Sequence, residues 1–298
     1  MRQLHLDSGR TMRGGQWQVL QLLRGLRKRG AETVLLARGA LLARARQEDF
    51  AAGELTWGNL LAEAPGSVLI HAHSGGAHTM AAACRLLPWV RSPLFVSRRV
   101  AFGPRRGLLS RWKYSRAACF LAVSAHVRDR LTGAGVNPTS IRVVPDGAAP
   151  LPRMPWDGRI VALDLRDRKK GGALLRRIGL PFTYISDLET ELPGARLLVY
   201  LSDSEGLGSA VISAMSAGVP VVASRVGGLK ELIEHEVTGL LVENGVEPVE
   251  SAARRLIDDE ALSQRLAAAA FERYAGRYTL ERLTDDTCAA YREFSSWK

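Results

Sequence analysis

The sequence predicts an α/β protein built from two units, each with a parallel sheet. Short β-branched or apolar runs alternate with helical periodicity along all 298 residues, a length that suits two domains of about 100–200 residues each. A proline-rich stretch at 145–155 separates halves of different charge, because residues 1–150 carry a formal +14 and the remainder −3. We therefore predict units over 1–150 and 151–278, followed by a closing segment over 279–298.

Runs typical of strands recur through both halves. In the first half they are Gln3–Leu6, Thr33–Ala37, Val68–Ala72, Leu94–Ser97, Phe120–Val123 and Ile141–Val144. In the second half they are Arg159–Leu163, Phe182–Tyr184, Leu197–Leu201, Val219–Ala223 and Gly239–Val242. Most gaps leave room for a helix, and such crossovers join parallel strands.

Helical periodicity is clearest between the first two strands, where apolar residues at helical spacing precede a stop signal at Gly30. These residues are Val19, Leu22, Leu23 and Leu26. In the second half, helices are expected at about 171–178, 208–217, 228–235, 247–257 and 260–274. The closing segment places Leu283, Thr287, Ala290, Tyr291 and Phe294 on one helical face. We expect this last helix to pack back across the domain boundary.

Composition excludes several classes of protein. No window approaches the ~18 consecutive apolar residues of a membrane-spanning helix, and the N-terminus lacks the apolar core of a signal peptide. A cytoplasmic protein is therefore expected. Cys84, Cys119 and Cys288 form no CxxC pair, so neither a disulfide framework nor a zinc ribbon is expected.

The first candidate site is the loop between the first strand and the first helix, which contains Gly14 and Gly15. Adjacent glycines let backbone N–H groups approach an anion, and a helix N-terminus adds about half a positive charge. A tight turn without a ligand is the alternative. The spacing is not GxGxxG, which disfavours a dinucleotide-dependent dehydrogenase.

The second candidate site follows the predicted strand at 197–201. Its loop contains Ser204 and Glu205 and leads into a predicted helix. Ligands of doubly wound sheets bind outside the carboxyl ends of the strands. The two side chains and the loop amides are therefore expected at the binding edge of the second sheet.

Several motifs occur together along nearly the whole chain. They are Arg13-Gly-Gly-Gln16, Val68-Leu-Ile-His-Ala-His73, Val123-Ser-Ala-His-Val-Arg128, Ile141-Arg-Val-Val-Pro-Asp-Gly147, Glu205-Gly-Leu-Gly208, the stretch 218–232 and Thr238-Gly-Leu-Leu-Val242. In this combination the chain resembles the family-four nucleotide-sugar glycosyltransferases, whose GT-B fold has two facing Rossmann-like domains. The resemblance implies transfer of a sugar from a nucleoside diphosphate donor, held mainly by the second unit, to an acceptor held mainly by the first. It also implies retention at the anomeric carbon, with no metal or other cofactor.

By this resemblance, Glu205 is a catalytic residue beside the donor sugar. Further donor-binding residues are expected in the two loops and in a basic turn, whose alternative is a solvated charge run: Gly14, Gly15, Gln16, Ser204, Gly206, Leu207, Gly208, Arg166, Lys169 and Lys170. Ser213 stands where the family's E-x7-E motif has its second glutamate. Ser213 is still expected among the donor-binding residues. Its hydroxyl forfeits charge-assisted hydrogen bonds to ribose worth about 1.5–3 kcal/mol, so we expect either weaker donor binding or a ribose that is held in another way.

Residues of the first unit are expected to bind the acceptor. His71 and His73 alternate along a strand and face one side, a spacing that also suits a metal. No third ligand is evident, so polar lining of the site is preferred. Arg99 stands where many relatives place a histidine and is expected to be catalytic, facing the donor phosphates. Arg98, Arg105 and Arg106 complete the expected acceptor-binding set.

A basic and partly aromatic segment runs from Arg98 to Arg116 without a carboxylate. It suits an amphipathic helix on an anionic membrane surface, with an attraction of about 1 kcal/mol per basic residue. A solvated helix face is one alternative. Nucleic acid is another, but no nucleic-acid-binding motif is present and no such partner is expected.

The sequence thus predicts a cytoplasmic glycosyltransferase, associated with the inner face of the membrane, that adds a sugar to a glycan or lipid-linked acceptor in envelope polysaccharide or lipopolysaccharide synthesis. The alternative is a degenerate GT-B protein that binds a nucleotide, a glycan or a partner without turnover. The span from Gly171 to Leu197 favours the alternative, since it leaves the second unit about one or two strand–helix units short of the family, each needing roughly 30 residues. Ser213 also favours the alternative. Glu205, the adjacent Gly14 and Gly15, and the basic loop at 166–170 favour activity.

Overall fold

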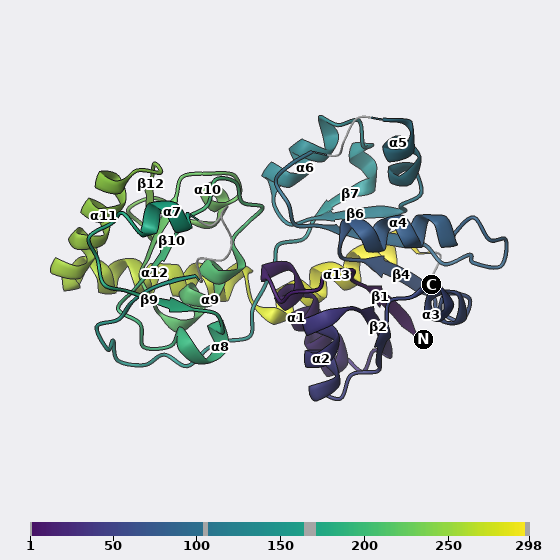
Figure 1. Ribbon diagram of the computed structural model, residues 1–298, viewed down its shortest axis with the longest axis horizontal. Coiled ribbons are helices and arrows are strands. Elements are labelled where there is room, and N and C mark those ends of the chain that lie inside the picture. The colour runs from purple at the N-terminus through teal and green to yellow at the C-terminus, as the bar shows by residue number, and fades with distance from the viewer. Residues whose placement is uncertain (1, 104–106, 164–170, 296–298) are drawn as a thin grey trace. The chain divides into compact units, whose positions relative to one another are not determined.

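The computed structural model describes residues 2–103, 107–163 and 171–295. The chain folds as two compact units (Figure 1). The first consists of Met1–Pro145 together with Glu281–Lys298, and the second of Asp146–Leu280. Five predicted site residues lie outside the described residues: Arg105, Arg106, Arg166, Lys169 and Lys170.

The described part of the first unit contains a seven-stranded parallel sheet in the order β3-β2-β1-β4-β5-β6-β7. The strands are β1 (Gln3–Leu6), β2 (Thr33–Ala37), β3 (Ala52–Glu54), β4 (Leu69–Ala72), β5 (Leu94–Arg98), β6 (Cys119–Ala122) and β7 (Ile141–Val143). The six predicted strands are confirmed to within a residue at each end. β3 was not predicted, because two half-buried residues and one exposed residue at a sheet edge carry no alternation of apolar and polar side chains.

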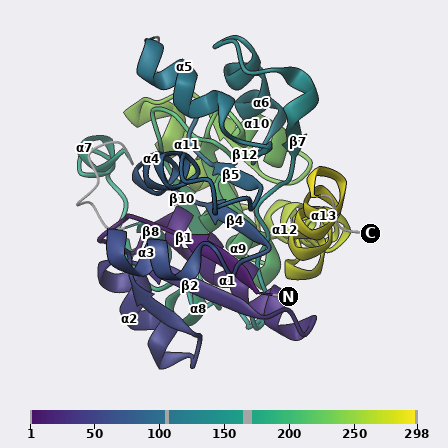
Figure 2. The same ribbon diagram turned by 90° about the vertical axis from the view of Figure 1, so that its right-hand side faces the viewer.

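Helices of the first unit connect these strands, as parallel pairing requires. They are α1 (Gly14–Lys28), α2 (Gly39–Gln47), α3 (Trp57–Glu63), α4 (Gly75–Cys84), α5 (Leu108–Ser115), α6 (Ala125–Thr132), a 3₁₀ turn (Pro138–Ser140) and the C-terminal α13 (Leu280–Phe294). Figures 1 and 2 show α6 beside β7 and α2 beside β2. The predicted apolar face of α1 is buried, and Gly30 follows the helix with a φ of 70° that suits glycine.

The described part of the second unit contains a five-stranded parallel sheet in the order β12-β11-β10-β8-β9. The strands are β8 (Ile160–Leu163), β9 (Phe182–Ile185), β10 (Leu197–Tyr200), β11 (Val221–Ser224) and β12 (Leu240–Val242). All five were predicted. β11 begins later than expected because Pro220 has no N–H to donate to the sheet.

Helices of the second unit are α7 (Gly172–Leu175), α8 (Leu188–Glu191), α9 (Ser209–Ala217), α10 (Leu229–Leu232), α11 (Val246–Asp258) and α12 (Glu260–Arg277). α7 is shorter than the predicted 171–178. Arg177 and Ile178 donate their N–H groups to Leu174 and Leu175, three residues back, so the helix tightens and ends. Ile160, Val199 and Val222 form the core of this unit with Leu256 and Leu266 of α11 and α12.

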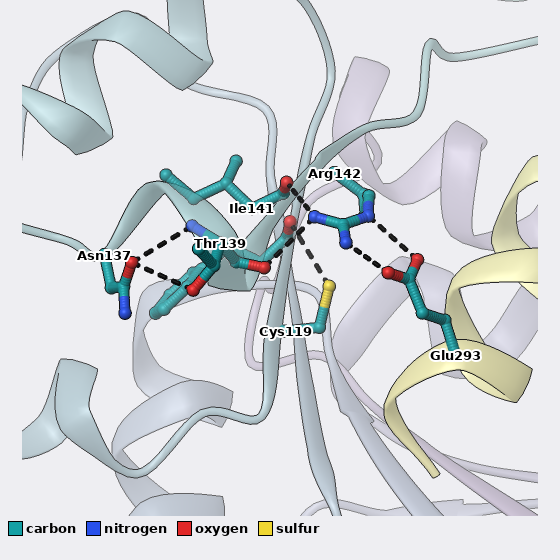
Figure 3. Close-up of polar contacts among 7 residues, drawn as sticks. Cys119, Asn137, Thr139, Ile141, Arg142 and Glu293 are labelled. Carbon is teal, nitrogen blue, oxygen red and sulfur yellow. Dashed lines mark hydrogen bonds and ion pairs between the residues drawn. The ribbon is translucent and has the colours of Figure 1, made fainter.

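The C-terminal helix α13 joins the first unit, as predicted for the closing segment. Leu283 and Tyr291 share a buried cluster with Leu22 of α1 and Phe95 of β5. Arg142 of β7 forms a bidentate ion pair with Glu293 of α13 (Figure 3). Its Nε donates to Oε2 at 2.8 Å, and its Nη2 donates to Oε1. Chain segments from opposite ends of the sequence therefore complete one core.

Of the helices in the described ranges, none combines the length and the apolar character that a membrane span requires.

Candidate active site

The loop after β10 holds Glu205 in a defined geometry. Tyr200 Oη donates a hydrogen bond to Glu205 Oε2 at 2.5 Å, and the Gly206 amide donates to Oε1 at 3.1 Å. The carboxylate is half-buried, while the neighbouring Ser204 is exposed. Both oxygens therefore have an oriented donor at the carboxyl end of the sheet, where the sequence placed this site.

The loop between β11 and α10 packs directly on the backbone beside Glu205. A Cβ at Gly227 would lie 2.2 Å from the Glu205 carbonyl oxygen, and one at Gly228 would lie 1.8 Å from the Gly206 carbonyl oxygen. The Gly228 amide donates to the Glu205 carbonyl at 3.0 Å. Only glycine permits this approach, so the glycine pair fixes the height of the Glu205 loop above the sheet.

Two polar side chains and the backbone of Ser202 brace the carboxyl ends of β10 and β11. The Ser202 amide donates to Ser224 Oγ at 3.0 Å, and that hydroxyl donates to Asn244 Oδ1 at 2.5 Å. Asn244 Nδ2 donates a hydrogen bond to the Ser202 carbonyl at 3.1 Å and closes the cycle. Ser202 and Ser224 are fully buried whereas Asn244 is exposed, so the closed cycle reaches from the core to the surface.

The remaining loop and helix residues differ in what they can offer a ligand. Gly206, Leu207 and Gly208 are buried and present mainly backbone groups. Gly208 has a φ of 113°, a conformation that favours glycine, and leads into the N-terminus of α9. Ser213 lies within α9, where its hydroxyl donates to the Ser209 carbonyl at 3.3 Å. That bond is internal to the helix and explains how a serine is accommodated there.

In the first unit, the loop between β1 and α1 is organised around Asp7. Asp7 Oδ1 accepts bonds from the Gly9 amide at 2.7 Å and from Gln16 Nε2 at 3.1 Å. Asp7 is 1% exposed, and burial raises the pKa of its carboxyl. Gly14 and Gly15 form the start of α1, and no side chain caps this helix. Binding of an anion by the first amides of α1 stays a prediction.

A buried histidine cluster occupies the same end of the first sheet. His5 Nδ1 and His73 Nε2 are 3.0 Å apart, and Arg99 Nη1 donates to His73 Nδ1 at 3.3 Å. His5 was not among the predicted site residues, because nothing near it in the sequence marks it. Its proximity follows from the sheet order, which places β1 beside β4 with His5 opposite His71.

His71 is engaged within the core. It is fully buried, and its ring nitrogens are hydrogen-bonded to Tyr291 Oη at 2.5 Å and to Ser97 Oγ at 2.8 Å. Burial holds the pKa of its imidazole well below the usual value and raises that of Tyr291. These contacts give His71 a packing role that joins α13 to β4 and β5.

Arg98 and Arg99 lie side by side in sequence but point to different partners. Arg98 donates to the Phe102 carbonyl and stacks its guanidinium 5.1 Å from the centre of the Phe102 ring. Arg99 instead meets the histidine cluster. The structure therefore brings Arg99 and His73 together and directs Arg98 toward the segment that leads to α5.

α5 presents an exposed apolar and basic face. Leu108 and Leu109 are 86% and 75% exposed, and Arg111 beside them is exposed. Lys113 has a different role, because its Nζ donates to the Gly75 carbonyl of α4 at 2.7 Å. Tyr114 stacks on Phe120 at 5.2 Å, so one side of α5 packs while the other stays uncovered by the described part of the chain.

Comparison with known proteins finds a family that the second unit resembles. Residues 180–273 match the family model described as "Glycosyl transferases group 1". The second unit thus resembles the group 1 glycosyl transferases. This match spans the Glu205 loop and the glycine pair that supports it, and it confirms the family-four resemblance.

Two curated relatives align with part of the chain. The D-inositol 3-phosphate glycosyltransferase of Geodermatophilus obscurus is 35% identical over 112 residues, which are 38% of this chain and 24% of that protein. The N-acetyl-alpha-D-glucosaminyl L-malate synthase of Bacillus anthracis is 35% identical over 88 residues, which are 29% of this chain and 23% of that protein. The chain thus matches only about a quarter of these relatives' lengths.

A solved structure matches the whole fold. HepE of Anabaena, in a crystal structure described as a complex with UDP-glucose, superposes with a TM-score of 0.84 at 17% identity. The match covers 98% of this chain and 100% of HepE. The chain therefore has the GT-B fold, and a second unit of this size occurs in another protein of that fold.

Proposed function

We propose that the protein is a retaining glycosyltransferase that transfers a sugar from a nucleoside diphosphate donor. The observation that carries the proposal is the geometry of Glu205, whose carboxylate is oriented by Tyr200 and the Gly206 amide at the carboxyl end of the second sheet. A carboxylate fixed in this way can accept hydrogen bonds from sugar hydroxyls. It can also stabilise the positive character that develops at the anomeric carbon.

Charge on the departing diphosphate needs a stabilising partner as well. α9 begins at Ser209, directly after the Glu205 loop, and its N-terminal amides and dipole favour an anion. We propose that the α9 amides meet this charge in the second unit. The donor-phosphate role of Arg99 in the first unit stays a prediction, and residues 166–170 lie outside the described residues. A short second unit is compatible with donor binding, since HepE, matched along its full length, is described in complex with UDP-glucose.

The main alternative is a GT-B protein that binds a nucleotide or glycan without turnover. A binding screen of uridine, guanosine and adenosine diphosphates and their sugars distinguishes the two, when followed by a hydrolysis and transfer assay on each ligand that binds. The proposal expects binding of one nucleotide and release of its sugar. Binding without turnover in the presence of glycan and lipid-linked acceptors would support the alternative, and no binding at all would reject the donor site.

We further propose that the acceptor is a glycan or lipid-linked molecule of envelope polysaccharide or lipopolysaccharide synthesis, reached from the cytoplasmic face of a membrane. The exposed Leu108 and Leu109 beside Arg111 support attachment to anionic lipid, because apolar insertion and charge attraction reinforce one another. The first unit as a whole carries the cationic excess of the chain.

Vesicle co-sedimentation tests this attachment. We expect binding to vesicles containing anionic lipid, loss of binding at high salt, and weaker binding of the double variant Leu108→Ser, Leu109→Ser. Met154→Ser, which changes an exposed apolar residue of the second unit, serves as the matched control. Equal binding to neutral vesicles would reject the electrostatic part of the proposal.

A further inference from the structure

Three side chains from neighbouring strands form a hydrogen-bonded chain at one end of the first sheet. Arg99, directly after β5, donates from Nη1 to His73 Nδ1 at 3.3 Å. His73, directly after β4, is bonded through Nε2 to His5 Nδ1 of β1 at 3.0 Å. His5 is fully buried and His73 is 8% exposed, so water scarcely competes for these bonds.

The chemistry of arginine gives this chain a single direction. A guanidinium has donors only, so His73 must present a lone pair at Nδ1. Burial lowers the pKa of His73 far below neutrality, and a neutral ring with a bare Nδ1 carries its proton on Nε2. His73 therefore donates to His5 Nδ1. Burial lowers the pKa of His5 to about 3, so His5 is neutral as well and carries its proton on Nε2.

The last side chain of this hydrogen-bonded series, His5, carries an energetic cost. His5 Nε2 is buried and has no hydrogen-bond partner among the described residues. A buried unsatisfied donor costs about 1–3 kcal/mol, which an apolar side chain at the same position would avoid. Such a cost is expected where a polar group serves function rather than stability.

We propose that His5 and His73 are positioning residues that hold the Arg99 guanidinium in the orientation needed for sugar transfer. His73 fixes the direction of Arg99, and His5 fixes the ring of His73 and its tautomer. Both rings are uncharged, so they orient the cation without neutralising it. This inference rests on the proposed glycosyltransferase function, in which Arg99 stabilises the charge on the departing diphosphate.

A metal site is the competing interpretation of the same residues. One ring nitrogen from each of His5, His71 and His73 lies within 4.8 Å of the others. Three histidines are a ligand set that zinc uses in proteins. However, both nitrogens of His71 are bonded to Tyr291 and Ser97. The Arg99 cation on His73 would also repel a divalent ion. The contacts therefore favour the hydrogen-bonded chain.

The first test reads the tautomers without any substrate. The full-length protein has six histidines, so selective ¹⁵N-histidine labelling gives a spectrum simple enough to assign through single substitutions. We expect His5 and His73 to be neutral at pH 7, each with its proton on Nε2. A proton on Nδ1 of His73, a charged His73, or a stoichiometric metal lost in His5→Ala would overturn the proposal.

The second test uses a matched pair of variants at His73. His73→Asn keeps an oxygen near the Nδ1 position for Arg99 but loses the contact with His5. His73→Gln keeps a donor near the Nε2 position for His5 but loses the acceptor for Arg99. We expect kcat to fall about tenfold or more further in His73→Gln than in His73→Asn, with similar donor KM and melting temperature in the two variants.

The outcomes separate this inference from the function on which it rests. Equal kcat in the two variants of an active enzyme would show that Arg99 is not oriented through His73, and would overturn the inference alone. A wild-type protein that transfers no sugar from any donor would overturn the proposed function and the catalytic role of Arg99 with it. The ¹⁵N spectra would still show whether the hydrogen bonds from Arg99 through His73 to His5 exist.

Discussion

Tyr291 Oη and His71 Nδ1 lie 2.5 Å apart, although 220 positions separate the two residues in the sequence. Both side chains are buried, and the Tyr291 ring also packs edge-on against Phe95 at 4.8 Å between ring centres. One contact thus joins the last helix of the chain to the middle of the first sheet. It combines apolar packing with a hydrogen bond that water cannot replace.

Removing the hydroxyl of this contact should destabilise the first unit. We expect Tyr291→Phe to lower the free energy of unfolding by about 1–3 kcal/mol, because His71 Nδ1 is left buried without a partner. Urea unfolding measures the change. Tyr184→Phe, the same substitution at a 40%-exposed tyrosine of the second unit, is the control and should change stability by less than about 0.5 kcal/mol. Equal effects would contradict the role of the contact.

Removing α13 altogether should prevent folding of the first unit. Deletion of 279–298 uncovers Leu22, Leu26 and Phe95, which share a buried cluster with this helix. We expect an insoluble or inactive protein, judged by the soluble fraction after expression and by nucleotide-sugar turnover. A soluble, fully active truncation would show that the helix is dispensable.

Loss of the Glu205 carboxylate, or of the Tyr200 hydroxyl that is bonded to it, should lower kcat. We expect Glu205→Gln to reduce kcat by about 10²-fold or more, because a neutral amide stabilises developing positive charge poorly. Tyr200→Phe removes one oriented donor and should cause a smaller loss, about tenfold. Steady-state kinetics with the donor found by screening measures both. Tyr184→Phe is again the control, and wild-type kcat in Glu205→Gln would reject its catalytic role.

Restoring a carboxylate at position 213 should tighten nucleotide binding. Ser213→Glu is expected to lower Kd for the nucleoside diphosphate by about tenfold or more, since charge-assisted bonds to ribose contribute about 1.5–3 kcal/mol. Ser213→Ala removes only a bond internal to α9 and should leave Kd nearly unchanged. Calorimetric titration gives both constants. No gain in Ser213→Glu would count against the ribose contact.

Stability should fall as the pH drops below about 6.5. Burial lowers the pKa of His5 and His78 from 6.5 to about 3 and lowers those of His71 and His73 well below 6.5. Between these values the unfolded chain binds more protons than the folded one, so acid favours unfolding. Each such histidine contributes at most about 1.4 kcal/mol per pH unit.

One substitution isolates a single histidine's share of this dependence. His78 Nε2 is bonded to the Lys113 carbonyl at 3.1 Å, and a glutamine amide can donate the same bond. We expect His78→Gln to flatten the fall in unfolding free energy between pH 6.5 and pH 5, as followed by urea unfolding. A slope identical to that of the wild type would show that His78 is not buried as a neutral group.

Local patterns were sufficient to predict most of the fold. Alternation of strands and helices predicted both parallel sheets, and the run at 197–201 placed Glu205 after a strand. These signals depend on side-chain periodicity within a few residues. β3 and the early end of α7 escaped prediction, because an edge strand of three residues and a tightening final turn carry no such periodicity.

Residues that support the candidate site were harder to recognise. Asn244 belongs to the cycle with Ser202 and Ser224, and Gly228 packs on the Gly206 carbonyl. Nothing near Asn244 in the sequence marks it as a partner of β10. A glycine pair after a strand does signal a close backbone approach, but the sequence does not say what approaches.

The sequence by itself determined the class of fold, the order of the strands along the chain and the loop that carries Glu205, because each depends on interactions between near neighbours. The tertiary structure alone decided that His5 lies beside His73, that Arg99 ends the same chain of bonds and that Tyr291 bonds to His71. Those contacts depend on which strands pair and where α13 packs. Burial of apolar surface over the whole unit sets both, and no local pattern encodes them.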